Sequence, residues 1–163
     1  MTSLSATPEM RKPMPQPPPL GNTFLLVEDN PDDVELTLLA LERSNCLNPV
    51  DVVRDGAEAL DYLFRQGNHA GRPPGDEPRA ILLDIKLPLV DGIEVLRKIK
   101  ADARTRHLPV IMLTSSAQER DLDACYQLGT NSYIVKPVDS DRFFEAVRQI
   151  GLYWLVLNER DKV

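Results

Sequence analysis

The sequence predicts an α/β domain with a doubly wound, five-stranded parallel sheet flanked by five helices, and two observations carry that prediction. Five short apolar runs alternate with five segments whose apolar residues recur at helical spacing. The run at residues 81–83 is continuous rather than alternating, as in a strand buried on both faces of a parallel sheet. Right-handed crossovers are the default for such chains, whereas periodicity leaves the strand order open, with 2-1-3-4-5 as one of two common choices.

Composition narrows the class of protein. The 163 residues suffice for one domain with its own core. No stretch approaches the roughly 20 apolar residues of a membrane span, and no signal-peptide pattern opens the chain, so we expect a cytoplasmic protein with no membrane partner. The net charge of −6 disfavours a nucleic-acid partner, which would require a basic surface. Cys46 and Cys125 form no disulfide framework or zinc-site spacing.

The N-terminal segment differs from the rest of the chain. Residues 1–20 contain six prolines and show neither a helical nor a strand period, which predicts a disordered Pro-rich tail. A solvated leader is a simpler interpretation than a ligand for a proline-binding partner. We expect the folded domain over residues 21–158 and a short C-terminal tail over residues 159–163.

The first strand and helix place acids close to one another in the chain. The strand is predicted at residues 23–27 and ends on Glu28 and Asp29. Asn30 and Pro31 fit the N-cap and first helical positions. The next two residues are acids that the helix dipole favours in a first turn, Asp32 and Asp33. The expected apolar stripe of this helix comprises Val34, Leu38, Leu39 and Leu41.

The second strand is predicted at residues 50–54. Asp55 and Glu58 then form a capping box for a helix that Gly67 would end. The apolar residues of this helix are Ala59, Leu60, Leu63 and Phe64. Residues 68–79 hold three prolines and two glycines, which predicts an exposed loop.

The third strand stops on a carboxylate that packing alone would not place there, Asp84. In open α/β sheets, ligands and chemistry gather at the carboxyl ends of the strands, so Asp84 is our candidate reactive residue. Pro88 and an Asp91-Gly92 turn follow, and the turn opens a third helix. The apolar face of that helix comprises Ile93, Leu96 and Ile99.

The fourth strand is predicted at residues 109–113 and ends on Thr114. Ser116 and Glu119 fit a second capping box. The helix that they open is expected to run to Gly129.

The fifth strand is predicted at residues 131–135 and is closed by Lys136-Pro137, before a last helix from about residue 139 to 157. This helix carries more apolar surface than one stripe against a sheet can bury, so we expect a symmetric homodimer through it, with additional packing into the core as the alternative. The residues expected at this dimer and output face are Phe143, Val147, Ile150, Tyr153, Trp154 and Leu157.

Polar side chains thus follow the first, third, fourth and fifth strands. Carboxylates crowded at one edge repel one another unless a cation neutralises them, and with only oxygen ligands Mg²⁺ is the expected cofactor. A cation beside a carboxylate, with a lysine and a hydroxyl converging, fits phosphoryl transfer. Asp84 would attack and form an acyl phosphate, Lys136 would neutralise charge, and Thr114 would donate a hydrogen bond.

In this order and spacing, these motifs resemble the receiver domains of two-component response regulators. The resemblance covers residues 22–157. Its motifs are Glu28-Asp29, Asp84 with Pro88, Asp91-Gly92, Thr114, Tyr133 and Lys136-Pro137.

The resemblance implies a flavodoxin-like fold with strand order 2-1-3-4-5. It implies that Asp29, Asp84 and the backbone carbonyl of Lys86 hold Mg²⁺, with Glu28 acting largely through water. It also implies a cis Lys136-Pro137 bond. Such a domain is not an enzyme toward other molecules, because it catalyses only its own phosphoryl transfer and dephosphorylation.

The resemblance further implies a conformational switch. Thr114 would move toward the phosphoryl group and Tyr133 would turn inward. The change would be read on the face of the fourth helix, fifth strand and fifth helix. Lys86 and Ser116 occupy positions that tune dephosphorylation in the family.

Two segments are similar to a narrower group, the single-domain regulators that serve bacterial phytochrome histidine kinases. They are residues 28–33 and 151–157. This resemblance implies a phytochrome-type sensor histidine kinase as the phosphoryl donor to a stand-alone response regulator.

Other functions stay open at this point. A phosphorylation-independent docking module would keep a vestigial site and would not respond to beryllofluoride with Mg²⁺. An aspartyl-phosphate phosphatase is less favoured, because Lys86 stands where its second acid would lie, two residues after the nucleophile. A nucleotide or flavin binder is weaker still, since no Gly-rich loop follows the first strand.

Overall fold

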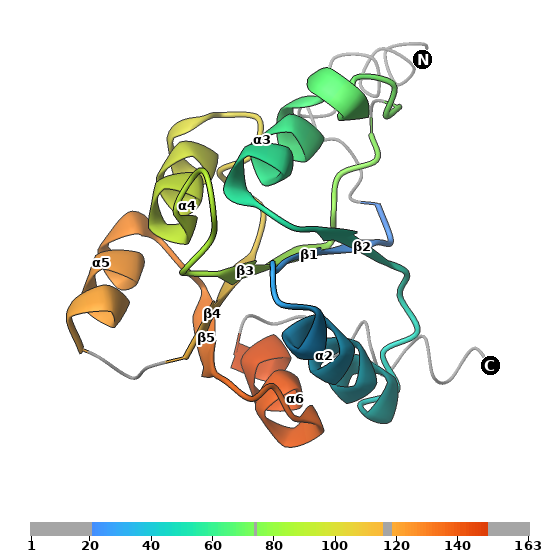
Figure 1. The fold of residues 1–163 in the computed structure, drawn as a ribbon, viewed down its shortest axis with the longest axis vertical. Helices are drawn as coiled ribbons and strands as arrows, with labels where there is room; N and C mark the ends of the chain where they lie inside the picture. Colours follow the sequence, from blue (N-terminus) through green and yellow to red (C-terminus); the bar gives the residue numbers. More distant parts are fainter. Residues whose placement is uncertain (1–20, 74, 116–118, 150–163) are drawn as a thin grey trace, which may run out of the picture.

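The computed structural model describes residues 21–73, 75–115 and 119–149. Five parallel strands form one sheet in the order β2-β1-β3-β4-β5 (Figure 1). The strands are β1 (Phe24–Val27), β2 (Val50–Val53), β3 (Ala80–Asp84), β4 (Val110–Thr114) and β5 (Ser132–Val135). The doubly wound architecture is confirmed, and the strand order that periodicity left open is the one that the resemblance implied.

Helices cover both faces of the sheet (Figure 1). One face is covered by α2 (Pro31–Arg43) and α6 (Ser140–Gln149), and the other by α3 (Gly56–Phe64), α4 (Gly92–Ala101) and α5 (Glu119–Leu128). A short 3₁₀ helix, η2 (Gly67–His69), follows α3. The core is accordingly split into two apolar layers, one on each face. No helix in the described ranges is long and apolar enough to cross a bilayer.

The strand register brings the strand ends together at one edge. Val27, the last residue of β1, pairs with Leu83, so Glu28 follows at the level of Asp84. Asp84 pairs with Leu113, one residue before Thr114. Thr114 in turn pairs with the last residue of β5, after which Lys136 follows. The carboxyl edge therefore collects the polar residues that the sequence placed there.

The apolar stripe predicted for α2 was partly wrong. Val34 and Leu41 are buried as expected, but Leu38 and Leu39 are 36% and 39% exposed. The buried face is completed instead by two small residues, Thr37 and Ala40. Small side chains at these positions let α2 approach the sheet and α6 closely, so the larger leucines point outward.

The predicted N-cap of α3 is confirmed, but the reciprocal bond of the capping box and the end of the helix differ from the prediction. The Glu58 N–H donates to the Asp55 carboxylate at 2.7 Å, but the Glu58 carboxylate accepts from the N–H of Arg54 rather than from Asp55. The helix ends at Phe64, before the predicted Gly67, because Arg65 adopts a left-handed conformation with φ of 54°.

The segment of residues 68–79 is not wholly exposed, contrary to the sequence prediction. Glu77 is 7% exposed and pairs with Arg65 at 2.9 Å. The peptide N–H of Gly21 donates to the Glu77 carbonyl at 2.6 Å, and the N–H of Arg79 donates to the Thr23 carbonyl at 2.7 Å. These bonds extend the pairing of β1 and β3 backwards and anchor the segment.

The predicted dimer face requires a correction. Phe143 and Val147 are each 1% exposed and belong to the core, where the Phe143 ring packs at 6.3 Å from Phe24. Their apolar surface is therefore already covered within the chain. The other predicted face residues, Ile150, Tyr153, Trp154 and Leu157, lie outside the described residues, as do the two tails and the Ser116 cap.

Candidate functional site

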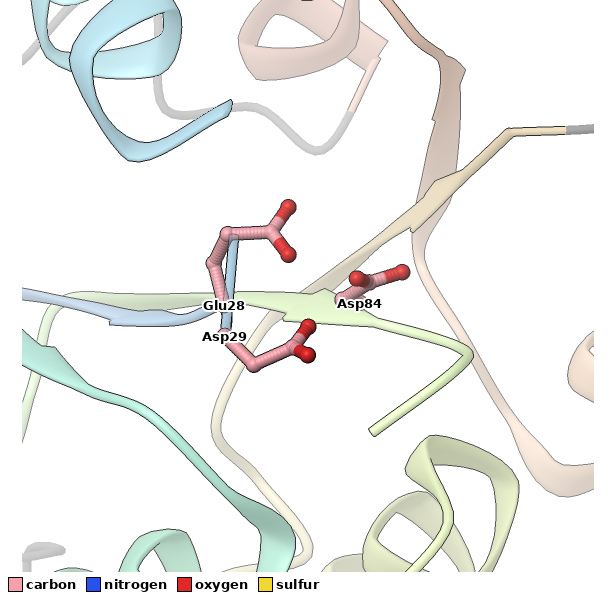
Figure 2. Close-up of side chains that lie close together, drawn as sticks. All are labelled: Glu28, Asp29 and Asp84. Atoms are coloured by element: carbon pink, nitrogen blue, oxygen red, sulfur yellow. The ribbon is translucent and has the colours of Figure 1, made fainter. Parts of the chain in front are cut away.

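Three carboxylates meet at the carboxyl edge of the sheet. Glu28 and Asp29 follow β1 directly, and Asp84 ends the neighbouring strand β3. Each offers one oxygen atom, and these atoms all lie within 4.8 Å of one another. Figure 2 shows the three side chains side by side at the ends of the two strands. The predicted grouping of acids from two strands is present in the structure.

These carboxylates differ in burial. Glu28 is fully buried and Asp84 is 5% exposed, whereas Asp29 faces solvent. Burial, together with the neighbouring Asp84 carboxylate, raises the pKa of Glu28 to about 7, and the Lys136 ammonium offsets this only in part. Asp84 also accepts the N–H of Lys86 at 3.3 Å. The cluster thus has one acid poised to take up a proton at neutral pH.

Lys136 enters the cluster from the end of β5. Its Nζ atom lies 2.5 Å from Glu28 Oε1, 3.0 Å from Asp84 Oδ2 and 3.1 Å from Asp33 Oδ2. Burial opposes the charge on this ammonium, but the Glu28 and Asp84 carboxylates outweigh it and raise the pKa of Lys136. The bond between Lys136 and Pro137 is cis, as the resemblance implied. Lys136 is therefore a fixed positive charge inside a pocket of carboxylates.

Asp33 is the site residue that sequence reasoning missed. The sequence explained it fully as an acid in the first turn of a helix. In the structure its side chain turns back toward the sheet edge and reaches Lys136. The available signal was its position: only three residues separate the end of β1 from the start of α2, so the first turn of the helix stays beside the strand ends and an acid there can face the site.

Thr114 and Gly92 shape the remaining walls. Thr114 ends β4, is 3% exposed, and accepts the N–H of Lys136 on its carbonyl at 2.7 Å. Gly92 starts α4 so close to the site that an added Cβ atom would lie 2.0 Å from the Asp84 carbonyl oxygen. Only glycine fits this approach, which explains the Asp91-Gly92 motif in structural terms.

Lys86 and Tyr133 lie at or beyond the rim of the site. Lys86 is exposed, with its backbone N–H on Asp84. Ser116 falls outside the described residues. Tyr133 is 37% exposed on β5 and meets the ring of Tyr126 on α5 edge-on, with centroids 6.0 Å apart. The two tyrosines line a groove that α5, β5 and α6 form.

The arrangement has the chemistry of a phosphoryl-transfer site. The oxygen-only donor set of Glu28, Asp29 and Asp84 suits a hard divalent cation such as Mg²⁺. Lys136 supplies a positive charge beside a carboxylate that can act as a nucleophile.

Comparison with known proteins agrees with this geometry. A sequence profile of the response regulator receiver domain matches residues 24–148. The chain belongs to the response regulator receiver domain family. Response regulator Rcp1 of Synechocystis sp. is 37% identical over 132 residues, which are 81% of this chain and 88% of Rcp1.

Solved receiver structures resemble this one closely. The bacteriophytochrome response regulator RtBRR is 51% identical, with a TM-score of 0.76 over 82% of this chain and 80% of that one. The phosphorylated cyanobacterial phytochrome response regulator RcpA is 39% identical, with a TM-score of 0.69 over 83% and 94% of the two chains. The Mn²⁺-bound form of Rcp1 has a TM-score of 0.68, 36% identity and coverage of 82% and 94%. The expected relation to phytochrome response regulators is confirmed.

Proposed function

We propose that this receiver domain is a phosphorylation switch in which Asp84 accepts a phosphoryl group from a sensor histidine kinase in a Mg²⁺-dependent reaction. One observation carries the proposal. Acids from β1 and β3 and the ammonium from β5 converge within hydrogen-bonding distance at one sheet edge. A purely structural role does not account for the buried charges of Glu28, Asp84 and Lys136, because desolvation costs about 3 kcal/mol or more per ion before pairing offsets it.

The residues present fit a magnesium ion. Asp29 and Asp84 would hold it with the backbone carbonyl of Lys86, and Glu28 would act through a water molecule. Bound there, the ion neutralises carboxylate charge and part of the charge on the transferring oxygens. The Mn²⁺-bound form of the related regulator Rcp1 supports this role for the site.

The positions of the side chains support the following transfer step. A carboxylate oxygen of Asp84 attacks the phosphorus of a phosphohistidine, the new O–P bond forms, and the P–N bond breaks with its electron pair returning to the imidazole. The Lys136 ammonium lies where it can follow the phosphoryl oxygens, because it already contacts Asp84 at 3.0 Å. The hydroxyl of Thr114, at the end of the adjacent strand, donates a hydrogen bond to a phosphoryl oxygen.

The donor in this proposal is a phytochrome-type histidine kinase. The support is the similarity to bacteriophytochrome and cyanobacterial phytochrome response regulators over more than four-fifths of the chain. The phosphorylated state of the relative RcpA supports phosphorylation as the signal.

The signal is read on the face formed by α5, β5 and α6. Thr114 moves toward the phosphoryl group and Tyr133 leaves its contact with Tyr126 to turn inward. Because Phe143 and Val147 are committed to the core, the homodimer proposed on this face would use the groove lined by Tyr126 and Tyr133. Lys86 and Ser116 set the lifetime of the acyl phosphate.

Phosphotransfer tests the proposal directly. A phytochrome-type kinase labelled on its histidine is mixed with wild type and with Asp84→Asn, with and without Mg²⁺. We expect rapid, Mg²⁺-dependent label on the wild type and none on the variant. Equal label on both proteins would refute the assignment of Asp84, and the absence of label from any kinase would favour a docking module.

A further inference from the structure

Asp33 is the third carboxylate on Lys136, and it lies outside the group of acids that fits a metal ion. Among the described residues, that group comprises Glu28, Asp29 and Asp84. Asp33 reaches the same ammonium from the helix side, with its Oδ2 atom 3.1 Å from Nζ. The role of Asp33 in the site is therefore toward the lysine and not toward the cation.

The start of α2 fixes Asp33 in this position. Asn30 caps the helix, and its side chain accepts the N–H of Asp32 at 2.9 Å and that of Asp33 at 3.3 Å. Pro31 sets the backbone of the first helical residue. With the first turn held beside the end of β1, the Asp33 side chain is 29% exposed and faces inward, whereas Asp32 is exposed to solvent.

Phosphorylation changes the balance around Lys136. In the unphosphorylated site the ammonium is shared among Glu28, Asp84 and Asp33. Once Asp84 carries a phosphoryl group, one carboxylate oxygen becomes the uncharged bridging oxygen of an acyl phosphate, and the anionic phosphoryl oxygens become the stronger partners. Asp33 keeps its charge and its place, so it competes for the lysine and repels the new anion.

We infer that Asp33 is a positioning residue that holds Lys136 back from the phosphoryl group and so weakens the phosphorylated state. The inference rests on the proposed function of Asp84 and Lys136. It assigns to one residue of α2 a part of the control that sets how long the signal persists.

The chain offers a matched control in the neighbouring residue. Asp32→Asn and Asp33→Asn remove the same charge from the same helix turn, with the same loss of interaction with the helix dipole. The structure gives Asp32 no ion pair with any described residue, so only Asp33→Asn removes one of the three carboxylate partners of Lys136. Asp33→Glu keeps a carboxylate that can reach the lysine, and Asp33→Ser serves as a second neutral variant.

Beryllofluoride is the probe, because it mimics a phosphoryl group on an aspartate. Its affinity is measured by calorimetry in excess Mg²⁺ for wild type and each variant. We expect Asp33→Asn and Asp33→Ser to tighten binding about fivefold, the upper end for a partly exposed ion pair, and Asp32→Asn and Asp33→Glu to stay within about twofold of wild type.

A second readout needs no metal. Hydrogen exchange of the Lys136 ammonium, followed by NMR in the metal-free protein, should accelerate in Asp33→Asn and stay unchanged in Asp32→Asn. Equal effects of the two substitutions, or weaker beryllofluoride binding by Asp33→Asn, would overturn the inference while leaving the proposed function intact. Wild type that fails to bind beryllofluoride with Mg²⁺ would overturn both.

Discussion

The side chains of Lys136 and Lys100 lie at opposite ends of the parallel strands, and both are partly buried. We call these ends the carboxyl edge and the amino edge of the sheet. Lys100, at the amino edge, donates to the carbonyls of Arg106 at 3.2 Å and Leu108 at 2.9 Å, and burial lowers its pKa. Lys136, at the carboxyl edge, meets three carboxylates, and its pKa is raised. At the amino edge, neutral backbone carbonyls accept hydrogen bonds from one ammonium group. At the carboxyl edge, a single ammonium group faces three carboxylates, so negative charge remains in excess.

This contrast indicates that polar groups at the amino edge serve stability, whereas those at the carboxyl edge form the candidate site. Two buried threonines, Thr130 and Thr114, differ between the edges in the same way. Thr130, at the amino edge, is 8% exposed. Its hydroxyl lies 3.1 Å from the carbonyl oxygens of both Val110 and Ser132 and can donate its hydrogen bond to either. Its position is fully explained by bonds to the backbone. The predictions below replace matched residues at the two edges or change the charge at one of them.

The largest effect is expected from the lysines. Lys136→Ala leaves Glu28, Asp84 and Asp33 without their cation, and we expect a loss of about 3 kcal/mol in the free energy of unfolding at pH 8 without Mg²⁺. Lys100→Ala should cost about 1 kcal/mol, because two carbonyls lose a donor but can recruit water. Urea titration measures both.

Beryllofluoride binding completes that comparison. Lys136→Ala should weaken it at least about tenfold, since a charge-assisted contact to the anion is lost, and Lys100→Ala should leave it unchanged. An equal effect of the two substitutions on binding would contradict the division between the edges.

Magnesium should stabilise the protein through the carboxyl edge alone. At a hundred times its dissociation constant, the ion should add about 2.7 kcal/mol to the free energy of unfolding. Asp29→Asn removes an exposed ligand without disturbing the core and should abolish this gain, whereas Lys100→Ala should retain it. Thermal unfolding with and without Mg²⁺ measures the effect, and a full gain in Asp29→Asn would place the ion elsewhere.

Glu28 predicts how stability depends on pH in the metal-free protein. Its pKa is raised from 4.5 to about 7 in the folded state, so between these values the folded protein holds a proton that the unfolded chain releases. Stability from this group is therefore complete below pH 4.5 and is lost as pH rises through 7. We expect a fall on the order of 3 kcal/mol over this window, since a pKa difference of one unit corresponds to about 1.4 kcal/mol.

Glu28→Gln should flatten that part of the stability profile, since the amide cannot ionise. Saturating Mg²⁺ should reverse the slope, because the cation favours the ionised carboxylates. Denaturant unfolding at a series of pH values gives the profile. If the stability of the metal-free protein instead rose from pH 5 to pH 8, the pKa of Glu28 would not be raised in the folded state.

The smallest effects should come from the two threonines. Thr130→Val removes one hydroxyl between two carbonyls and should cost about 1 kcal/mol of stability, without changing beryllofluoride affinity. Thr114→Val should lower that affinity, because the hydroxyl contacts the phosphoryl mimic. If Thr130→Val weakened binding as much as Thr114→Val, the amino edge would share in the chemistry.

Much of the fold and site followed from the sequence because the strand ends are local features. The buried run that ends on Asp84 and the run that ends on Lys136 each fix where a polar side chain leaves the sheet. The register of the parallel strands then brings these ends together at one edge of the sheet. The metal-compatible acids and their cation were predictable for that reason.

Other features depend on tertiary packing and were missed or misplaced. Asp33 has a sufficient local explanation in the helix dipole, so nothing in the sequence demanded a contact with Lys136, 103 residues away. Apolar residues of a helix do not reveal which layer covers them. Phe143 therefore looked available to a partner, although the core covers it, and Leu38 looked buried, although it is 36% exposed.

Chemical location of the phosphoryl group tests most sharply whether Asp84 is the acceptor. The protein is phosphorylated in the presence of Mg²⁺, the acyl phosphate is reduced with borohydride, and the peptides are sequenced by mass spectrometry. We expect that position 84 alone carries the reduced residue and that omission of Mg²⁺ removes it. Reduction at Asp29 or Asp33 instead, or a phosphate stable to borohydride on a hydroxyl group, would contradict it.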